Sequence, residues 1–209
     1  MAEFPSTNLV KICGVTTPAD ARVVVNTGAD IMGLILAKST RRLTPKAARR
    51  VADAVRGSIL TALVVRDQDD GFIWSSVQMV QPDVVQIHGM LSGALETRLR
   101  GDGRLIIKAL AIDTEEFENF DETRVDAVLV DGPTPGVGEV HSWSALERRH
   151  FVRPVIAAGG LTPDNVASTI ALVCPRGVDC ASGVESSPGR KDPTLVRRFV
   201  DNARRGFDQ

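Results

Sequence analysis

Two reactive side chains, Lys11 and Cys13, stand two residues apart at the end of a short apolar segment. In an extended strand this spacing directs both side chains to the same face. A neighbouring ammonium group favours the thiolate form of cysteine, which is the form that acts as a base or a nucleophile. The pair indicates chemistry of that kind, whereas the alternative is that Cys13 is a small buried apolar residue, as most free cysteines are.

A carboxylate ends another apolar run, because Asp131 directly follows Val128–Val130. Unpaired acidic side chains are rarely buried, so packing does not explain an aspartate at this position. The alternative is a helix cap, but the next helix is expected to begin only near Trp143. Asp131 is therefore predicted to be a functional residue.

Further polar residues follow two other apolar segments. Gln86 and His88 share one strand face, although a lone histidine in such a position is more often a hydrogen-bonded structural residue than a catalyst. Arg41 and Arg42 precede a predicted helix, where adjacent charges are usually solvated. The alternative is that one of them binds a substrate carboxylate, to which the planar guanidinium is suited.

Two glycine-containing turns follow the last two apolar segments and contain Gly159-Gly160 and Ser182-Gly183. Glycine lets backbone amides approach an anion closely, and a following helix directs its positive end toward that anion. In a (β/α)8 barrel, the loops after strands seven and eight are the recurrent phosphate site. The two turns therefore predict that a phosphate group is bound here.

The elements that must position these residues are indicated by eight short apolar segments whose starts lie about 24 residues apart. This interval accommodates one strand, one helix and two short loops. Most of the segments are continuously apolar, which is typical of parallel strands covered on both faces. The predicted strands are Val10–Cys13, Ile31–Ala37, Ile59–Val65, Val84–Ile87, Leu105–Leu110, Val125–Val130, Val155–Ala158 and Gly177–Ala181.

Four of the intervening segments begin with a capping oxygen followed by proline, a pair that favours a helix start. Gly28 and Gly57 are placed where the first two helices are expected to end. The eight β–α units predict a single (β/α)8 TIM barrel domain over residues 1–209. A doubly wound open sheet is the alternative, but no G-x-G-x-x-G follows the first strand. The capping pairs are Thr17-Pro18, Thr44-Pro45, Thr162-Pro163 and Asp192-Pro193.

The composition argues against several classes of protein. The 209 residues carry a net charge of -1, so the chain lacks the basic excess that nucleic-acid binding needs. The apolar runs are too short to cross a bilayer and the first residues show no signal peptide, which predicts a cytoplasmic protein without a membrane partner. Three cysteines without paired spacing predict neither a disulfide framework nor a metal site.

Taken together, these residues resemble the phosphoribosylanthranilate isomerase family of tryptophan biosynthesis, and the resemblance runs the length of the chain. The first and last motifs are quite specific to that family. The matching motifs are Lys11-Ile12-Cys13-Gly14, Gly28-Ala29-Asp30 with Gly33, Ser39-x-Arg41, Val85-Gln86-Ile87-His88-Gly89, Leu129-Val130-Asp131, Gly136-Val137-Gly138 with Trp143, Ala158-Gly159-Gly160-Leu161 with Asn165-Val166, and Gly177-Val178-Asp179 through Ser182-Gly183-Val184-Glu185 to Pro188-Gly189-Arg190-Lys191-Asp192.

The resemblance implies an Amadori rearrangement of a phosphorylated small molecule, without a metal or an organic cofactor. The family's acid corresponds to Asp131 and its base to Cys13, whose ordinary pKa of about 8.5 must be lowered, with Lys11 as a candidate cause. Asp131 must be held protonated for its step, which partial desolvation could accomplish. Arg41 is expected to bind the anthranilate carboxylate. The other implied contacts are Lys11, Gln86, His88 and Asp179 to the substrate, and the backbone amides around Gly159, Gly160, Ser182 and Gly183 to the phosphate.

The chain departs from the family pattern in the loop after strand six and beside Arg41. Thr40 replaces the usual proline before the arginine, and Arg42 replaces an aromatic residue after it. These changes are expected to affect rate and specificity more than the identity of the acid and base. The sequence leaves a monomer and a homodimer both open. The residues that differ in the strand-six loop are Pro135, Glu139, His141 and Ser142.

Two alternatives remain at this point. The histidine-pathway phosphoribosyl isomerase, or its bifunctional relative, predicts an aspartate where Cys13 stands. It also predicts a second phosphate site in the first half of the barrel, where the segment Arg66–Asp70 is expected to repel phosphate. A non-catalytic barrel that binds a phosphorylated ligand would be expected to lose its acid or its base, whereas Cys13 and Asp131 are both present.

Overall fold

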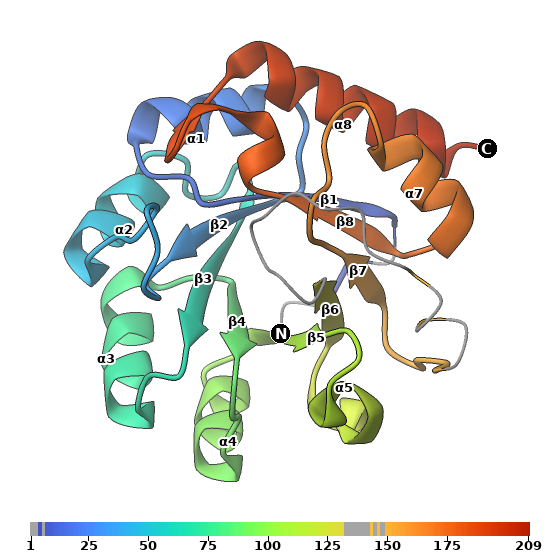
Figure 1. Cartoon of the computed structure of the whole chain (residues 1–209). Helices are drawn as coiled ribbons and strands as arrows, with labels where there is room; N and C mark the ends of the chain where they lie inside the picture. The colour runs from blue at the N-terminus through green and yellow to red at the C-terminus, as the bar shows by residue number, and fades with distance from the viewer. Residues whose placement is uncertain (1–3, 6, 132–142, 144–145, 147–148) are drawn as a thin grey trace.

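The computed structural model describes residues 4–5, 7–131, 143, 146 and 149–209. Its eight parallel strands close into a barrel in which each strand pairs with its sequence neighbours and β1 pairs with β8 (Figure 1). This confirms the predicted (β/α)8 barrel, and every predicted strand overlaps an observed one. The strands are β1 (Leu9–Cys13), β2 (Ile31–Ile35), β3 (Leu60–Arg66), β4 (Val84–His88), β5 (Leu105–Ala111), β6 (Ala127–Asp131), β7 (Val155–Ala157) and β8 (Gly177–Cys180).

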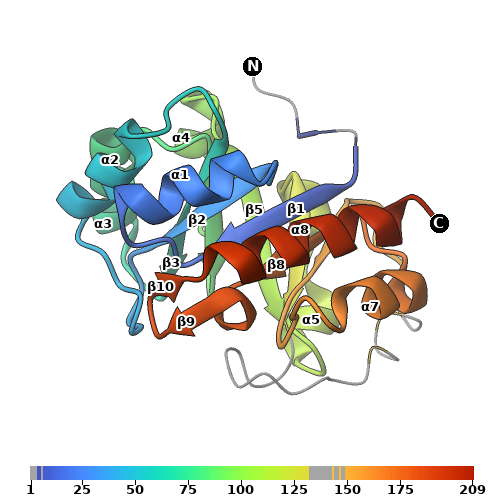
Figure 2. The same cartoon turned by 90° about the horizontal axis from the view of Figure 1, so that it is seen from above.

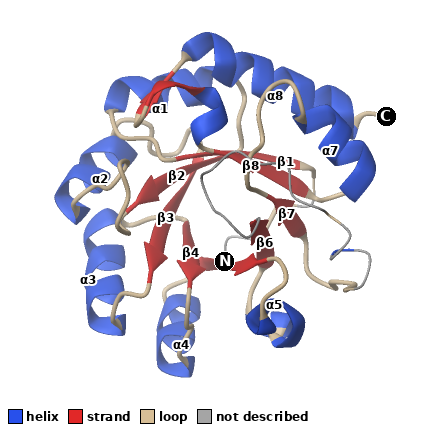
Figure 3. Ribbon diagram, viewed as in Figure 1, coloured by secondary structure: helices blue, strands red, loops and turns tan. Residues whose placement is uncertain are grey.

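Helices surround the barrel on the outside (Figure 3). They bury their apolar faces against the outward side chains of the strands, which forms the larger of two apolar clusters. None of the described helices is long and apolar enough to cross a membrane. The helices are α1 (Pro18–Asn26), α2 (Pro45–Asp53), α3 (Asp70–Val80), α4 (Gly93–Gly101), α5 (Glu115–Asn119), α7 (Val166–Val173) and α8 (Pro193–Phe207), with the 3-10 turns η1 (Glu122–Arg124) and η2 (Ser182–Val184).

Three of the four predicted helix caps are confirmed. The side chains of Thr17, Thr44 and Asp192 accept hydrogen bonds from backbone N–H groups in the first turns of α1, α2 and α8. Gly28 follows the end of α1 with a positive φ of 78°, as expected. Gly57 also has a positive φ, but it lies within a turn that follows α2 rather than at the end of the helix.

The helix start predicted at Thr162 is wrong, because α7 begins only at Val166. The Thr162 N–H donates to Asn165 Oδ1 at 2.8 Å, and Thr162 Oγ1 accepts from the Asp164 N–H at 3.2 Å. These local hydrogen bonds hold a turn that takes the place of the first helical turn.

Side chains alternate between the barrel interior and the helical layer, as strand geometry requires. In β1, Val10 and Ile12 belong to the outer cluster, whereas Leu9, Lys11 and Cys13 face the interior. The lower interior is apolar, and polar side chains occupy the level nearest the carboxyl ends of the strands. The apolar interior consists of Leu9, Ile31, Ala62, Val84, Leu105, Ile107, Ala109, Ala127, Leu129, Ile156 and Ala158.

A repeated carboxylate contact closes the amino-terminal rim of the barrel. Asp30, Asp83 and Asp126 directly precede β2, β4 and β6. Each accepts a hydrogen bond from the backbone N–H of the second residue of the preceding strand. The distances are 2.6 Å to Val10 N, 2.8 Å to Thr61 N and 2.7 Å to Ile106 N.

A two-stranded antiparallel hairpin, which was not predicted, lies between β8 and α8 at the opposite rim. It consists of β9 (Glu185–Ser187) and β10 (Arg190–Lys191). Figure 2 shows it beside the start of α8. Thr16, after β1, donates from Oγ1 to the Gly189 carbonyl at 2.7 Å, so the hairpin is tied to the loop that follows β1.

Candidate active site

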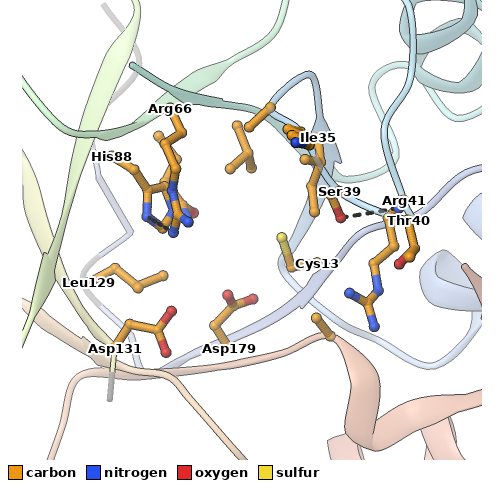
Figure 4. Close-up of a pocket in the computed structure, with 15 residues that line it drawn as sticks. Cys13, Ile35, Ser39, Thr40, Arg41, Arg66, His88, Leu129, Asp131 and Asp179 are labelled. Carbon is orange, nitrogen blue, oxygen red and sulfur yellow. Dashed lines mark hydrogen bonds between the residues drawn. The ribbon is translucent and has the colours of Figure 1, made fainter. Parts of the chain in front are cut away.

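A cavity of about 370 Å³ opens at the carboxyl ends of the strands (Figure 4). It brings together six of the side chains predicted from the sequence, namely Cys13, Arg41, Gln86, His88, Asp131 and Asp179. In Figure 4, His88 and Arg66 lie on one side of the view and Arg41 on the other, with Asp131 and Asp179 below them and Cys13 toward the centre. Lys11 lies out of contact with the cavity, and Arg42 does not line it. The other lining residues are Ile35, Ala37, Lys38, Ser39, Thr40, Val64, Arg66, Leu129 and Ala181.

Lys11 and Asp179 form a buried ion pair beside the Cys13 thiol. The Lys11 Nζ donates to Asp179 Oδ1 at 2.9 Å, and the Lys11 side chain is fully buried. Burial alone would lower the pKa of Lys11, but its interactions with Asp179 and Cys13 raise it above its ordinary value. Lys11 is therefore a cation whose charge is largely matched by Asp179.

Lys11 lowers the pKa of Cys13, as expected, but other effects outweigh it. Burial raises the pKa of the Cys13 thiol, the charge of Lys11 lowers it, and the charge of Asp179 raises it again. The net pKa lies above the ordinary value because the ion pair leaves little positive charge to offset the cost of burial. Cys13 is accordingly a thiol.

Asp131 ends β6 and lines the main cavity together with Leu129, which lies two residues earlier on the same strand face. It also lines a second cavity of about 70 Å³ next to the first. Asp179 likewise lines both. A ligand that fills the two cavities would therefore pass between these two carboxylates.

The smaller cavity collects the residues predicted to bind phosphate. Gly159 and Gly160 adopt left-handed backbone conformations with φ of 91° and 68°, and both line it together with Ser182. Gly183 does not line it. A Cβ on Gly183 would lie 2.1 Å from the Leu161 carbonyl oxygen, so this glycine allows the two loops to approach each other.

Arg41 is held by a carboxylate that sequence reasoning did not single out. Its Nε and Nη2 donate to the two oxygens of Glu185 at 2.6 and 2.8 Å. The fully buried Lys191 side chain donates to Glu185 at 3.0 Å and to the Ala181 carbonyl at 2.8 Å. Burial raises the pKa of Glu185, but the two cations hold it below its usual range. The hairpin thereby fixes Arg41 beside the cavity.

From the sequence, Arg66 is expected to belong to an acidic loop, whereas the structure separates it from the acidic residues that follow. It ends β3, two residues after the inward-facing Val64, and lines the cavity, whereas the acidic residues that follow it do not. Asp69 instead caps α3. The period of two from Val64 was the signal that could have identified Arg66. The first residue of this segment is therefore a cation that faces the cavity.

His88 lies between Arg66 and Gln86. Its Nδ1 is 3.1 Å from Arg66 Nη2, and its Nε2 is 2.9 Å from Gln86 Nε2. Burial lowers the pKa of His88 to about 3, and the positive charges of Arg66, Lys11 and Lys108 contribute in the same direction. The imidazole is therefore neutral at neutral pH.

Several predictions fall on residues outside the described part of the chain. They concern the motif Gly136-Val137-Gly138 and the substitutions at Pro135, Glu139, His141 and Ser142. Trp143 is described and is 7% exposed, within the outer apolar cluster. Among the described residues, no three His, Cys, Asp or Glu side chains gather in a way that could hold a metal ion.

The fold and the site define a (β/α)8-barrel protein whose cavity, at the carboxyl ends of the strands, contains a thiol, two carboxylates and two guanidinium groups. The family model described as N-(5'phosphoribosyl)anthranilate (PRA) isomerase matches residues 10–202. The chain belongs to this family, as the sequence motifs predicted.

Named relatives agree with this assignment. The chain is 37% identical over 202 residues to the N-(5'-phosphoribosyl)anthranilate isomerase of Geotalea uraniireducens, covering 93% of this chain and 98% of that protein. It is 38% identical over 210 residues to the isomerase of Haloarcula marismortui, covering 93% and 95%.

Solved structures of the same family superpose closely. The phosphoribosyl anthranilate isomerase of Thermotoga maritima gives a TM-score of 0.83 at 34% identity, with 95% of this chain and 99% of that chain covered. A phosphoribosyl anthranilate isomerase in complex with reduced 1-(o-carboxyphenylamino)-1-deoxyribulose 5-phosphate gives a TM-score of 0.79 at 31% identity, with 95% and 99% covered.

Proposed function

We propose that this protein is an isomerase of tryptophan biosynthesis that converts N-(5'-phosphoribosyl)anthranilate into 1-(o-carboxyphenylamino)-1-deoxyribulose 5-phosphate. One observation carries the proposal. Cys13 and Asp131 line the same cavity, and Asp131 also borders the small cavity formed by Gly159, Gly160 and Ser182. A phosphorylated sugar whose phosphate occupies the small cavity would place its ring beside both groups.

The reaction needs one acid and one base. Asp131 would donate a proton to the ring oxygen of the sugar as the nitrogen lone pair breaks the C1–O bond, which opens the ring and leaves a protonated imine (an iminium group) at C1. Cys13, as the thiolate, would then remove the proton from C2 to give an enolamine, which becomes the aminoketose. Asp131 must be protonated when its step begins and Cys13 must be ionised before its own step.

The remaining residues bind the two ends of the substrate. Backbone amides around Gly159, Gly160 and Ser182 suit the phosphate because they donate hydrogen bonds without adding charge. Gly183 supports this site by keeping the two loops close. Arg41 uses Nε and Nη2 for Glu185, which leaves its Nη1 group for the carboxylate of the anthranilate ring.

The buried polar residues complete the proposed site. Lys11 and Asp179 act on the ionisation of Cys13, and Asp179 also borders the path between the two cavities. Gln86 and His88 form the wall across from Arg41. Because His88 is neutral, it supplies a hydrogen bond or a contact surface and takes no part as an acid.

Four further proposals concern the protein as a whole. Residues 1–209 form one domain, the protein acts in the cytoplasm, and it works as a monomer or a homodimer without an added cofactor. One solved relative is described as mutually generated monomers of the dimeric isomerase of Thermotoga maritima, so both states occur in solved structures of the family.

The assignment is tested by turnover of freshly generated N-(5'-phosphoribosyl)anthranilate, followed by loss of substrate fluorescence. We expect wild type to be active and Asp131→Asn to lose about 1000-fold in kcat, since general acid catalysis contributes on that order. The variant should still bind a reduced product analogue. Asp164→Asn is the matched control, because the exposed Asp164 side chain pairs with Arg198 on the surface and does not line either cavity. Absence of turnover by the wild type refutes the assignment.

A further inference from the structure

Arg66 differs from Arg41 in how much of its hydrogen-bonding capacity is already used. Both guanidinium groups line the cavity, on opposite sides (Figure 4). In Arg41, the Nε and Nη2 groups along one edge of the guanidinium both donate hydrogen bonds to the two oxygens of Glu185. The Arg66 side chain makes a single hydrogen bond within the described part of the chain, from Nη2 to His88 Nδ1 at 3.1 Å. Most of its N–H groups are therefore available to a ligand.

The contact with His88 has a defined direction. A guanidinium group has five N–H donors and no acceptor, so His88 Nδ1 must accept this hydrogen bond. A neutral imidazole carries one hydrogen, which must then lie on Nε2. Arg66 therefore fixes the tautomer of His88.

The hydrogen on Nε2 in turn determines the orientation of the Gln86 amide. As placed, Gln86 Nε2 faces His88 Nε2 at 2.9 Å, and the buried Gln86 Oε1 has no partner among the described residues. Two donors cannot bond to each other, whereas a half-turn of the amide brings Oε1 to accept from His88 Nε2–H. A chain of donors thus runs from Arg66 through His88 to Gln86 and holds the Arg66 side chain against the wall.

The position of Arg66 defines which part of a ligand it can meet. The small phosphate-type cavity adjoins the large one at Asp131 and Asp179. Arg66, at the end of β3, lies on the far side of the large cavity from these carboxylates (Figure 4). A substrate with its phosphate in the small cavity would extend its other end, the aromatic acid, toward this side.

We infer that Arg66 is a specificity-determining residue that binds the carboxylate of the substrate from the side of the cavity opposite Arg41, and that its bond to His88 holds it in place for this contact. The inference rests on the proposed function for the identity of the acid. A planar fork of N–H groups matches a carboxylate in geometry and charge.

The test compares binding of two reduced product analogues, one made from anthranilate and one from aniline, which lacks the carboxylate. We expect Arg66→Met to weaken binding of the first analogue about 10- to 100-fold, as for loss of hydrogen bonds to a charged group. Binding of the aniline analogue should stay unchanged. Arg42→Met is the matched control, because Arg42 is exposed and does not line the cavity; it should bind both analogues like wild type.

A second readout tests the contact with His88. In wild type labelled with 15N-histidine, we expect the His88 hydrogen on Nε2, and in Arg66→Met we expect a shift toward the other tautomer. Equal weakening of both analogues by Arg66→Met, no weakening of either, or a wild-type hydrogen on Nδ1 would each overturn the inference. Turnover by the wild type is a separate measurement, so failure of the proposed function remains distinguishable.

Discussion

The Cys13 thiol lies in a buried part of the cavity where two neighbours act on it in opposite directions. Lys11 favours the thiolate, but its charge is matched by Asp179 at 2.9 Å, and burial dominates. A base with a raised pKa is ionised in only a small fraction of the molecules at neutral pH. Substrate binding or a rise in pH must therefore supply the active form.

This balance predicts how the ionisation of Cys13 depends on pH. Because the pKa of Cys13 lies above its ordinary value, the thiolate fraction should be small at neutral pH and should still be increasing at pH 9. Ionisation of Cys13 can be followed by ultraviolet thiolate absorbance, as the difference between Cys174→Ser and Cys13→Ser/Cys174→Ser proteins. Removing Cys174 first avoids the exposed thiol. A Cys13 that is fully ionised at pH 7 would contradict the prediction.

At the scale of the elements, the β9–β10 hairpin is the part of the structure that holds Arg41. Glu185 in β9 accepts from both Arg41 and Lys191, and all three side chains are at most 16% exposed. Removing one charge from such a buried network leaves the others without full compensation. The hairpin therefore links the stability of the barrel rim to the binding of the substrate's carboxylate by Arg41.

We expect Glu185→Gln to lower the free energy of unfolding by about 2 kcal/mol, as for loss of a buried hydrogen bond between charged groups. It should also raise KM several-fold, because Arg41 is no longer held in one orientation. Ser187→Ala, at the exposed end of the same strand, is the control and should change neither quantity. Chemical denaturation and steady-state kinetics provide the two measurements. An unchanged KM with reduced stability would show that the hairpin does not position Arg41 for binding.

The sequence was sufficient to predict the elements whose signals are local. Continuous apolar runs identify the eight strands, and a capping side chain before proline identifies the starts of α1, α2 and α8. The same capping signal failed at Thr162, whose Oγ1 accepts from the Asp164 N–H and whose own N–H donates to Asn165 Oδ1 within a turn. Helix boundaries that depend on local hydrogen bonds between side chains and backbone cannot be predicted from residue types alone.

The parts of the site that escaped prediction depend on contacts between distant segments. The hairpin contains no apolar run, and it is held by Arg41 and Thr16 from loops far away in the chain. Glu185 could not be assigned a role without knowing that Arg41 lies opposite. The position of Arg66 could have been predicted, because it lies two residues after the inward-facing Val64 on the same strand face. Its place beside the acidic residues that follow instead favours a loop.

At the scale of the whole molecule, the two rims of the barrel have different roles. The rim at the carboxyl ends of the strands holds the cavity, whereas the opposite rim is closed by Asp30, Asp83 and Asp126. Asp83 accepts from both the backbone N–H and the Oγ1 of Thr61, at 2.8 and 2.9 Å. In this fold, residues at the amino-terminal rim contribute to stability and those at the other rim to activity.

This division predicts that the two properties can be changed separately. Asp83→Ala should lower the free energy of unfolding by about 2 kcal/mol, because the Thr61 N–H loses its partner, and should leave kcat/KM unchanged. Asp201→Ala is the control, since Asp201 on α8 makes no hydrogen bond or ion pair with any residue that the structure describes. A large loss of activity in Asp83→Ala would contradict the separation of roles.

The three carboxylates at the amino-terminal rim also affect where local unfolding of the barrel begins. Amides near the start of a strand usually exchange their hydrogen with solvent rapidly, because the ends of strands fray. Here the amides of Val10, Thr61 and Ile106 each donate to a side chain from the next β–α unit. Their exchange should be as slow as in mid-strand, which would make the odd-numbered strands β1, β3 and β5 resistant to fraying from this end and leave local opening to begin elsewhere.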